Sequence, residues 1–146
     1  MVRLLGINHV ALEVDDLDEA LAWYGRFFEI RLRGRRPKMA WIDMGDQFLA
    51  LAEGRAQGPD RHRHFGLVVD DKESLRSELV AAGVSVQARG GLDFQDPWGN
   101  QIQVVDYRDV QFSKIPEILA QLVPEGIKKS EAALEELRAK GIKLER

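Results

Sequence analysis

The sequence predicts an α+β fold made of two consecutive βαβββ modules, followed by a C-terminal helical extension. The first observation is an internal repeat, because His9–Asp16 reappears as His64–Asp71 with a histidine at its start and an Asp-Asp pair at its end. The second observation is that apolar residues at helical spacing follow each copy. The third is that short strand-like segments, separated by glycine turns, come after each helical stretch.

The helix that follows the first copy is expected to carry its apolar residues between Leu17 and Phe28. Asp16 is placed to cap it, and Glu19, three residues later, completes a capping box. After the second copy, a shorter apolar stripe runs from Leu75 to Ala82. Gly83 is placed to end that helix.

Three short strands are expected after each helix. The predicted strands lie near Ile30–Arg33, Met39–Met44 and Gln47–Glu53 in the first module, and near Val84–Ala88, Leu92–Gln95 and Gln101–Asp106 in the second. Gly45 and Gly99 mark the last turn of each module, where a positive φ is expected. The modules therefore span about residues 4–53 and 62–107, within a domain of residues 1–108.

Residues 109–146 are predicted to form a helical extension. Ser113 is placed to cap a first helix, whose first turn tolerates Pro116. Ser130 is placed to cap a second helix that ends at Gly141. The first helix carries one apolar face, made of Ile115, Ile118, Leu119 and Leu122. Acidic and basic residues balance in this extension, which favours packing or a dimer contact over binding to nucleic acid.

The composition excludes several classes of protein. The chain of 146 residues has no cysteine, so it has no disulfide, thiol nucleophile or thiolate metal site. A net charge of −3 gives no electrostatic basis for binding nucleic acid. The longest apolar runs, such as Phe48–Ala52, are far shorter than the roughly 20 residues of a membrane span. With no signal-peptide pattern at the start, a cytoplasmic location is expected.

One local concentration of charge stands out. It is a basic run consisting of Arg31, Arg33, Arg35, Arg36 and Lys38. Such a run is typical of a solvated β-turn or loop, and the alternative is a rim that binds anions.

Strand parity separates each repeated histidine from the bulky residues of its strand, because alternate residues point to opposite faces of a sheet. His9 shares its face with the small residue Ala11, and His64 shares its face with Gly66. In the last strand, Gln103 takes the equivalent face. The opposite face carries the residues that a helix covers, Val10, Leu12 and Val14 in the first copy and Phe65, Leu67 and Val69 in the second. Small neighbours indicate a cavity wall, and a pseudo-twofold arrangement would bring both histidines to one shared site.

These segments resemble the vicinal oxygen chelate superfamily, the glyoxalase/bleomycin resistance protein/dioxygenase group. Gly6–Leu17 with Trp23-Tyr24 is similar to the opening strand and helix of that family, and Arg63–Asp71 to the start of its second module. Asp96–Tyr107 resembles its closing hairpin. The match covers about residues 4–107. It implies a U-shaped mixed sheet around a cavity, a small-molecule ligand and a homodimer, because the family commonly builds its cavity from modules of two chains.

The resemblance also implies a metal site with one ligand from each of four strands. His9 and His64 correspond to two of the ligands, and Gln103 stands where the family usually has a glutamate. The fourth position falls at Leu49 or, with a shift of one residue, at Ala50, and neither side chain binds a metal. Glu53 and Glu13 are candidates for a displaced carboxylate.

This donor set leaves the charge of a divalent ion uncompensated, because two imidazoles and an amide are all neutral. Either an ion of Zn, Ni, Mn or Fe binds weakly and needs an anionic chelating substrate, or the site has lost its metal.

Two functions follow from the resemblance. The first is a divalent-metal-dependent lyase or isomerase acting on a small oxygenated substrate. True lactoylglutathione lyase activity is not expected, because Gln103 cannot accept the proton that a metal-bound glutamate takes in glyoxalase-type members. Extradiol dioxygenase chemistry is not expected either, because it needs an iron site with two histidines and one carboxylate, and Gln103 is not a carboxylate. No catalytic residue is identified. The second is a non-catalytic binding or resistance-type protein with a degenerate metal site. Its cavity would be lined by four aromatic residues, Trp41, Phe94, Trp98 and Tyr107.

Overall fold

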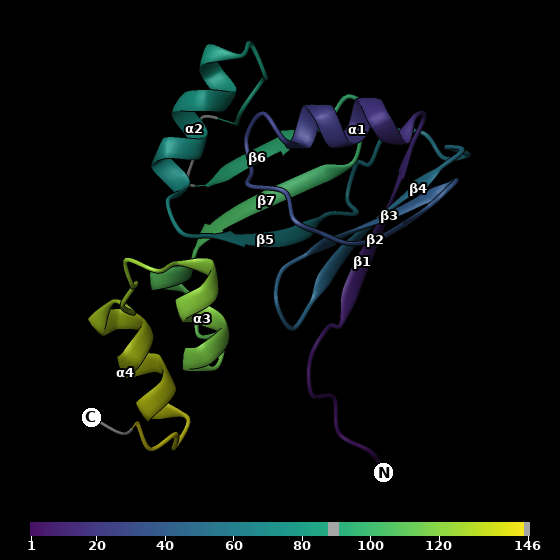
Figure 1. The fold of residues 1–146 in the computed structure, drawn as a ribbon. Helices are drawn as coiled ribbons and strands as arrows, with labels where there is room; N and C mark the ends of the chain where they lie inside the picture. The colour runs from purple at the N-terminus through teal and green to yellow at the C-terminus, as the bar shows by residue number, and fades with distance from the viewer. Residues whose placement is uncertain (88–90, 145–146) are drawn as a thin grey trace. The chain divides into compact units, whose positions relative to one another are not determined.

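The computed structural model describes residues 1–87 and 91–144 and confirms the α+β fold class (Figure 1). In chain order its elements are β1 (His9–Val14), α1 (Leu17–Tyr24), β2 (Leu32–Arg36), β3 (Met39–Asp43), β4 (Phe48–Glu53), β5 (Phe65–Val69), α2 (Lys72–Ala81), β6 (Leu92–Gln95), β7 (Gln101–Asp106), a short 3-10 helix (Tyr107–Asp109), α3 (Pro116–Leu122) and α4 (Glu131–Ala139). No helix among the described residues has the length and apolar character that crossing a membrane requires.

The chain divides into two compact units that do not follow the modules strictly. The first unit holds Met1–Phe65 together with Gln95–Gln101, and the second holds Gly66–Phe94 together with Ile102–Arg146. The turn between β6 and β7 therefore groups with the first module, although it comes from the second half of the sequence.

The sheet of the first unit has the strand order β1-β4-β3-β2. β1 and β4 are parallel, and β3 is antiparallel to both of its neighbours. Two predicted bounds were wrong. The strand expected at Ile30–Arg33 is β2, which begins at Leu32 and runs to Arg36 with a shift of register between Leu32 and Gly34. The helix expected to reach Phe28 ends at Tyr24, where the amide of Gly25 bonds to the carbonyl of Leu21.

The sheet of the second unit has the order β5-β7-β6. The strand predicted at Val84–Ala88 was wrong over residues 84–87, where the structure has only an isolated bridge between Val86 and Phe94. The amide of Val84 is already bonded to the carbonyl of Leu79, which ties the start of this segment to the end of α2. Ala88 lies outside the described residues.

The Asp-Asp pairs of the repeat serve as helix caps in both modules. The carboxylate of Asp16 accepts from the amide of Glu19 at 2.9 Å, and that of Asp71 accepts from the amide of Ser74 at the same distance. An aspartate in this position satisfies an amide that a helix start leaves without a partner. Gly83 follows α2 with a φ of 76°, which confirms its predicted role as a helix stop.

The predicted strand parity is confirmed in the first unit. Leu12 and Val14 of β1 are buried, whereas His9 and Ala11 are exposed. The buried face continues across the sheet and onto α1, with Ala40, Ile42, Leu49, Leu51, Leu17, Ala20 and Tyr24 as its other members. The carboxylate of Glu53 accepts from the amide of Leu17 at 3.4 Å and so joins the end of β4 to the start of α1.

A buried carboxylate organises the turn between β6 and β7. Asp96 is 4% exposed, and its oxygens accept from the amides of Trp98 and Asn100 and from the side-chain amide of Asn100, at 2.8 to 3.0 Å. The hydroxyl of Tyr24 donates to the same carboxylate at 2.8 Å. Asn100 also donates to the carbonyl of Glu13 at 3.0 Å. These bonds connect the turn to α1 and β1 within the first unit.

The C-terminal extension corrects one predicted cap and confirms the other. Ser113 does not cap α3, since Ile115 is the N-cap residue and Pro116 takes the first helical position. A proline at the first helical position has no N–H group, so none is left there without a hydrogen-bond partner. The proline also favours extended backbone at the preceding residue. Ser130 caps α4 as predicted, because its hydroxyl oxygen accepts from the amide of Ala133 at 3.3 Å.

Lys129 holds the start of this extension to the end of β7. Its ammonium group donates to the carbonyls of Tyr107 and Val110, both at 2.7 Å, and to that of Phe112. The same group lies 3.6 Å from the centre of the Tyr107 ring. Burial lowers the pKa of Lys129, because the charged form loses water.

The hydroxyl of Tyr24 should stabilise the fold in a pH-dependent way. Burial, and then the nearby charge of Asp96, raise the pKa of Tyr24 well above its ordinary value. The unfolded chain therefore loses this proton at a lower pH than the folded chain, and the stabilisation is present below about pH 10 and is lost as the pH rises above it.

We expect Tyr24→Phe to lower the free energy of unfolding by about 2 kcal/mol at pH 7, because a hydrogen bond to a charged group is lost. Between pH 7 and about 10.5, the difference between the two proteins should shrink, because only the wild type carries this ionisable hydroxyl. Urea denaturation of both proteins at the two pH values measures the effect. A difference that stays constant or grows would contradict this account.

Candidate functional site

The exposed face of the first sheet carries the predicted ligand His9. The pairing of β1, β4 and β3 sets three rows across this face, namely His9, Phe48 and Asp43, then Ala11, Ala50 and Trp41, then Glu13, Ala52 and Met39. Paired residues of neighbouring strands point to the same side of a sheet. The site must therefore be built from these side chains on the face opposite α1.

The register decides between the two positions that the sequence left open for the fourth ligand. Leu49 pairs with Val10 on the covered face and is 5% exposed. Ala50 pairs with Ala11 on the face that carries His9. The equivalent position is therefore Ala50, and a methyl group gives a metal no donor.

Both repeated histidines contact an oxygen through the same ring nitrogen, Nδ1. The Nδ1 atom of His9 lies 2.8 Å from the amide oxygen of Asn8, and the His9 ring stacks on Phe48 with centroids 4.6 Å apart. The Nδ1 atom of His64 lies 3.0 Å from the carbonyl oxygen of His62. Because these oxygens accept, each Nδ1 carries the hydrogen and each Nε2 keeps its lone pair. Histidines that bind metals commonly have this second hydrogen bond, which fixes the tautomer.

The structure does not test whether the three predicted ligands converge. His9 and His64 belong to the first unit, and Gln103 belongs to the second. Gln103 is half-buried between the buried residues Ile102 and Val104, so its predicted strand parity is confirmed. In the described parts of the chain, no three His, Cys, Asp or Glu side chains form a group that could hold a metal ion. The shared site remains a prediction.

The two candidates for a displaced carboxylate both have other partners. Glu53 bonds to the start of α1 on the covered side. Glu13, on the face of His9, accepts from the amides of Ala56 and Gln57 at 2.9 and 3.1 Å. These two bonds lower the pKa of Glu13. Both carboxylates thus fix backbone segments in this structure.

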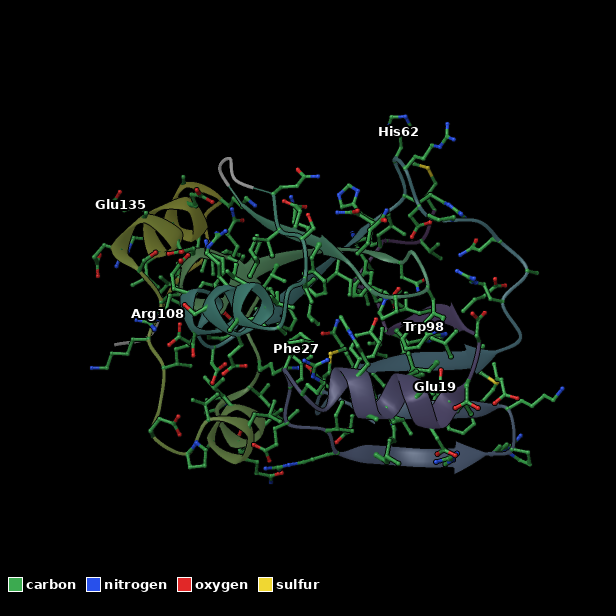
Figure 2. The ribbon with its side chains drawn as sticks, turned by 90° about the horizontal axis from the view of Figure 1, so that it is seen from above. Glu19, Phe27, His62, Trp98, Arg108 and Glu135 are labelled. Atoms are coloured by element: carbon green, nitrogen blue, oxygen red, sulfur yellow. The ribbon has the colours of Figure 1, made fainter. Side chains whose placement is uncertain are left out.

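The four aromatic residues predicted to line a ligand cavity lie in different surroundings. Phe94, Trp98 and Tyr107 are buried, at 2%, 6% and 8% exposure. The Trp98 ring meets that of Trp23 edge-on at 6.4 Å, beside α1 (Figure 2). Trp41 is half-buried and lines a hollow on the face of His9.

That hollow is open and has a volume of about 320 Å³. It is lined by Arg33, Gly34, Trp41 and Phe48. The guanidinium of Arg33 lies 5.1 Å from the centre of the Phe48 ring, on the same side of the sheet as His9. Sequence reasoning missed Phe48 and Gly34, because assigning them to this face requires the pairing of β4 with β1 and of β2 with β3.

Residues 6–104 match a family described as the Glyoxalase/Bleomycin resistance protein/Dioxygenase superfamily. A metallothiol transferase, FosB of Bacillus licheniformis, is 26% identical over 116 residues, which are 70% of this chain and 75% of the relative. A glutathione transferase, FosA of Serratia marcescens, is 26% identical over 113 residues, which are 69% of this chain and 80% of the relative.

Solved structures show the same fold. The crystal structure of a lactoylglutathione lyase from Agrobacterium tumefaciens aligns with a TM-score of 0.58 and 22% identity, covering 72% of this chain and 96% of the other. At this identity the likeness concerns the fold.

The tautomers of the two histidines can be measured directly. At a pH of about 8, where imidazole is normally neutral, we expect the ring nitrogens of His9 and His64 to show a protonated Nδ1 and a bare Nε2 in long-range ¹⁵N–¹H NMR spectra. His62, which is exposed and projects from its loop (Figure 2), serves as the internal reference. An Asn8→Ala substitution should return His9, but not His64, to the mixture of a free imidazole. A dominant Nε2–H form in either histidine would contradict the assignment.

Proposed function

Because the chain belongs to the glyoxalase/bleomycin resistance protein/dioxygenase superfamily, we propose that it is a divalent-metal-dependent enzyme acting on a small oxygenated substrate. The observation that carries this proposal is the matched pair of histidines. Each one donates from Nδ1 to an oxygen of a nearby residue and keeps Nε2 for a ligand.

The residues that would hold the ion are His9 and His64 through Nε2, and Gln103 through its amide oxygen. Imidazole suits Zn, Ni and Fe, and an amide oxygen is an acceptable but weaker donor. The set fits a divalent ion in ligand type and falls short in charge, because it has no carboxylate. A bound ion would polarise the oxygens of the substrate as a Lewis acid.

Gln103 bears on the class of reaction. A glutamine cannot act as a general base, so abstraction of a proton at this position of the chain is disfavoured. The two relatives are named as a metallothiol transferase and a glutathione transferase, and glutathione is a thiol. A thiol needs less help to become a nucleophile, because its ordinary pKa of about 8.5 leaves some thiolate near neutral pH. The chain has no cysteine, so a small-molecule thiol would have to bring the sulfur. We therefore favour group transfer over the lyase or isomerase reaction.

A second candidate, a non-catalytic binding protein, is favoured by the two ligand positions that lack a carboxylate, Ala50 and Gln103. The two candidate functions predict different metal contents for the purified protein. Elemental analysis of protein purified without chelator should find at least a fraction of the chains loaded with a transition metal if the chain is a metalloenzyme. Binding of a small molecule by metal-free protein at full stoichiometry, with no metal detected, would favour the second candidate.

We expect Gln103→Glu to strengthen metal binding by at least about tenfold, because an anionic ligand offsets part of the charge of the ion at nearly unchanged shape. Calorimetric titration with Zn²⁺, Ni²⁺ and Mn²⁺ on the wild type and the variant measures this. His9→Ala is the control and should abolish binding in both backgrounds. Tight binding that survives His9→Ala would place the ion elsewhere, and no gain from Gln103→Glu would support the non-catalytic candidate.

We also propose a homodimer. The segment before β1 forms no helix or strand and exposes five apolar side chains, Met1, Val2, Leu4, Leu5 and Ile7. β1 and β5 are the edge strands of their sheets, so each has a row of backbone groups available for pairing. A second copy of the chain would cover both features.

Light scattering at micromolar concentration should give about twice the 16.5 kDa of one chain. Leu5→Glu should shift the protein toward monomer, because a charge would be buried in the interface. Arg3→Glu, which changes a neighbouring residue that is already polar, is the matched control. A wild type that is monomeric throughout would overturn the proposal.

A further inference from the structure

The arginines in and next to β2 differ in the partners of their guanidinium groups. Arg31 forms an ion pair with Glu29 at 2.8 Å, and Arg35 forms one with Asp18 at the same distance. Arg33 and Arg36 form no ion pair with any residue that the structure describes. Their guanidinium groups lie instead over aromatic rings, Arg33 at 5.1 Å from Phe48 and Arg36 at 5.8 Å from Trp41.

The two uncompensated arginines share one face of β2. Arg36 pairs with Met39, and Gly34 pairs with Trp41, so both lie on the side that carries His9. The shift of register between Leu32 and Gly34 lets Arg33 reach the same side. Arg35 pairs with Ala40 on the covered side, where it meets Asp18 of α1. The basic run thus separates into arginines with carboxylate partners and arginines beside the hollow.

The hollow beside Arg33 has an aromatic floor, and Arg36 lies over the ring of Trp41 at its edge. Gly34 has no side chain, and a Cβ there would meet Cε3 of Trp41 at 3.4 Å, so the indole lies close along the strand backbone. Trp41 is only half-buried. An aromatic face beside a guanidinium suits a flat, conjugated molecule, which stacks on the ring while its negative group bonds to the cation.

Two carboxylates lie on this face of the sheet. Glu13 shares the row of Met39, which pairs with Arg36, and it accepts from the amides of Ala56 and Gln57. Asp43 lies in the row of Phe48 and His9, next to the row of Trp41 and beside the hollow that Phe48 lines. The negative charge of Asp43 there opposes the binding of an anion.

We propose that this hollow is a binding site for a flat organic anion, a conjugated or aromatic carboxylate whose acid group pairs with Arg33 and Arg36 and whose ring lies on Trp41. The inference rests on the proposed function in that it names the class of small oxygenated substrate. It needs no metal, because each feature that carries it belongs to a single sheet of one chain.

The experiment uses full-length protein freed of metal with EDTA, and 2-hydroxybenzoate as the probe. Binding is followed by NMR through the indole N–H signal of Trp41, which is assigned by its absence in Trp41→Phe, while circular dichroism confirms the fold of every variant. The neutral analogue 2-hydroxybenzamide tests the need for charge, and inorganic phosphate tests the need for a flat ring. Both should bind at least about tenfold more weakly than 2-hydroxybenzoate, since each lacks one of the two interactions.

Four variants complete the test. Arg33→Gln and Arg36→Gln should each weaken binding of 2-hydroxybenzoate by about fivefold or more, whereas Arg31→Gln, which removes the same charge from an arginine outside the hollow, should change it by less than about twofold. Asp43→Asn should strengthen binding, because it removes the opposing charge. A purely structural role for these residues predicts no gain there.

Equal weakening by Arg31→Gln and Arg33→Gln would show only a general effect of net charge and would overturn the inference. So would equal affinity for the acid and its amide, or a Trp41 signal that does not move. If the metal titration fails while the hollow still selects the flat anion, the proposed metalloenzyme alone falls.

Discussion

The first unit depends on the carboxylate of Asp96, because this one buried group gathers donors from parts of the chain that are far apart in sequence. Tyr24 donates to it from α1, and the amides of Trp98 and Asn100 donate from its own turn. The side-chain amide of Asn100 also donates to the carbonyl of Glu13, and this bond links the turn to the backbone of β1. A buried carboxylate without these partners would be strongly destabilising, so the turn, the helix and the strand must be in place together. The strand that presents His9 is held by this network.

The sequence was informative where local periodicity decides the structure. The alternation of His9, Ala11 and Glu13 with Leu12 and Val14 follows from the geometry of any strand, and the Asp16 cap follows from the needs of a helix start. The pairing of strands is a non-local property, so sequence alone left Leu49 and Ala50 open and missed Phe48 as a neighbour of His9. The same applies to the basic run, which is uniform in sequence. Its arginines separate into those with carboxylate partners and those over aromatic rings only when other segments supply these partners.

The candidate site differs from its family's usual pattern in where the charge lies. The predicted metal ligands, His9, His64 and Gln103, are all neutral side chains in the state that binds an ion, whereas the neighbouring sheet surface carries Arg33 and Arg36 without carboxylate partners. An anionic ligand would balance the charge of an ion held by neutral ligands, and it would also balance the charge of the two arginines. The ligand, rather than the protein, would then supply the negative charge that a carboxylate ligand supplies in the usual site.

The irregularity between Leu32 and Gly34 has a consequence for evolutionary change in this sheet. Arg33 and Arg36 are three positions apart, and in a strand of strict alternation they would point to opposite faces. Loss of Leu32 alone would keep every arginine and the net charge and would shorten the hairpin by one residue, yet it would restore strict alternation and send Arg33 to the helix side. Relatives with the same basic run can therefore differ in ligand preference through a one-residue deletion. Such a change is invisible in composition and appears as a minor gap in an alignment.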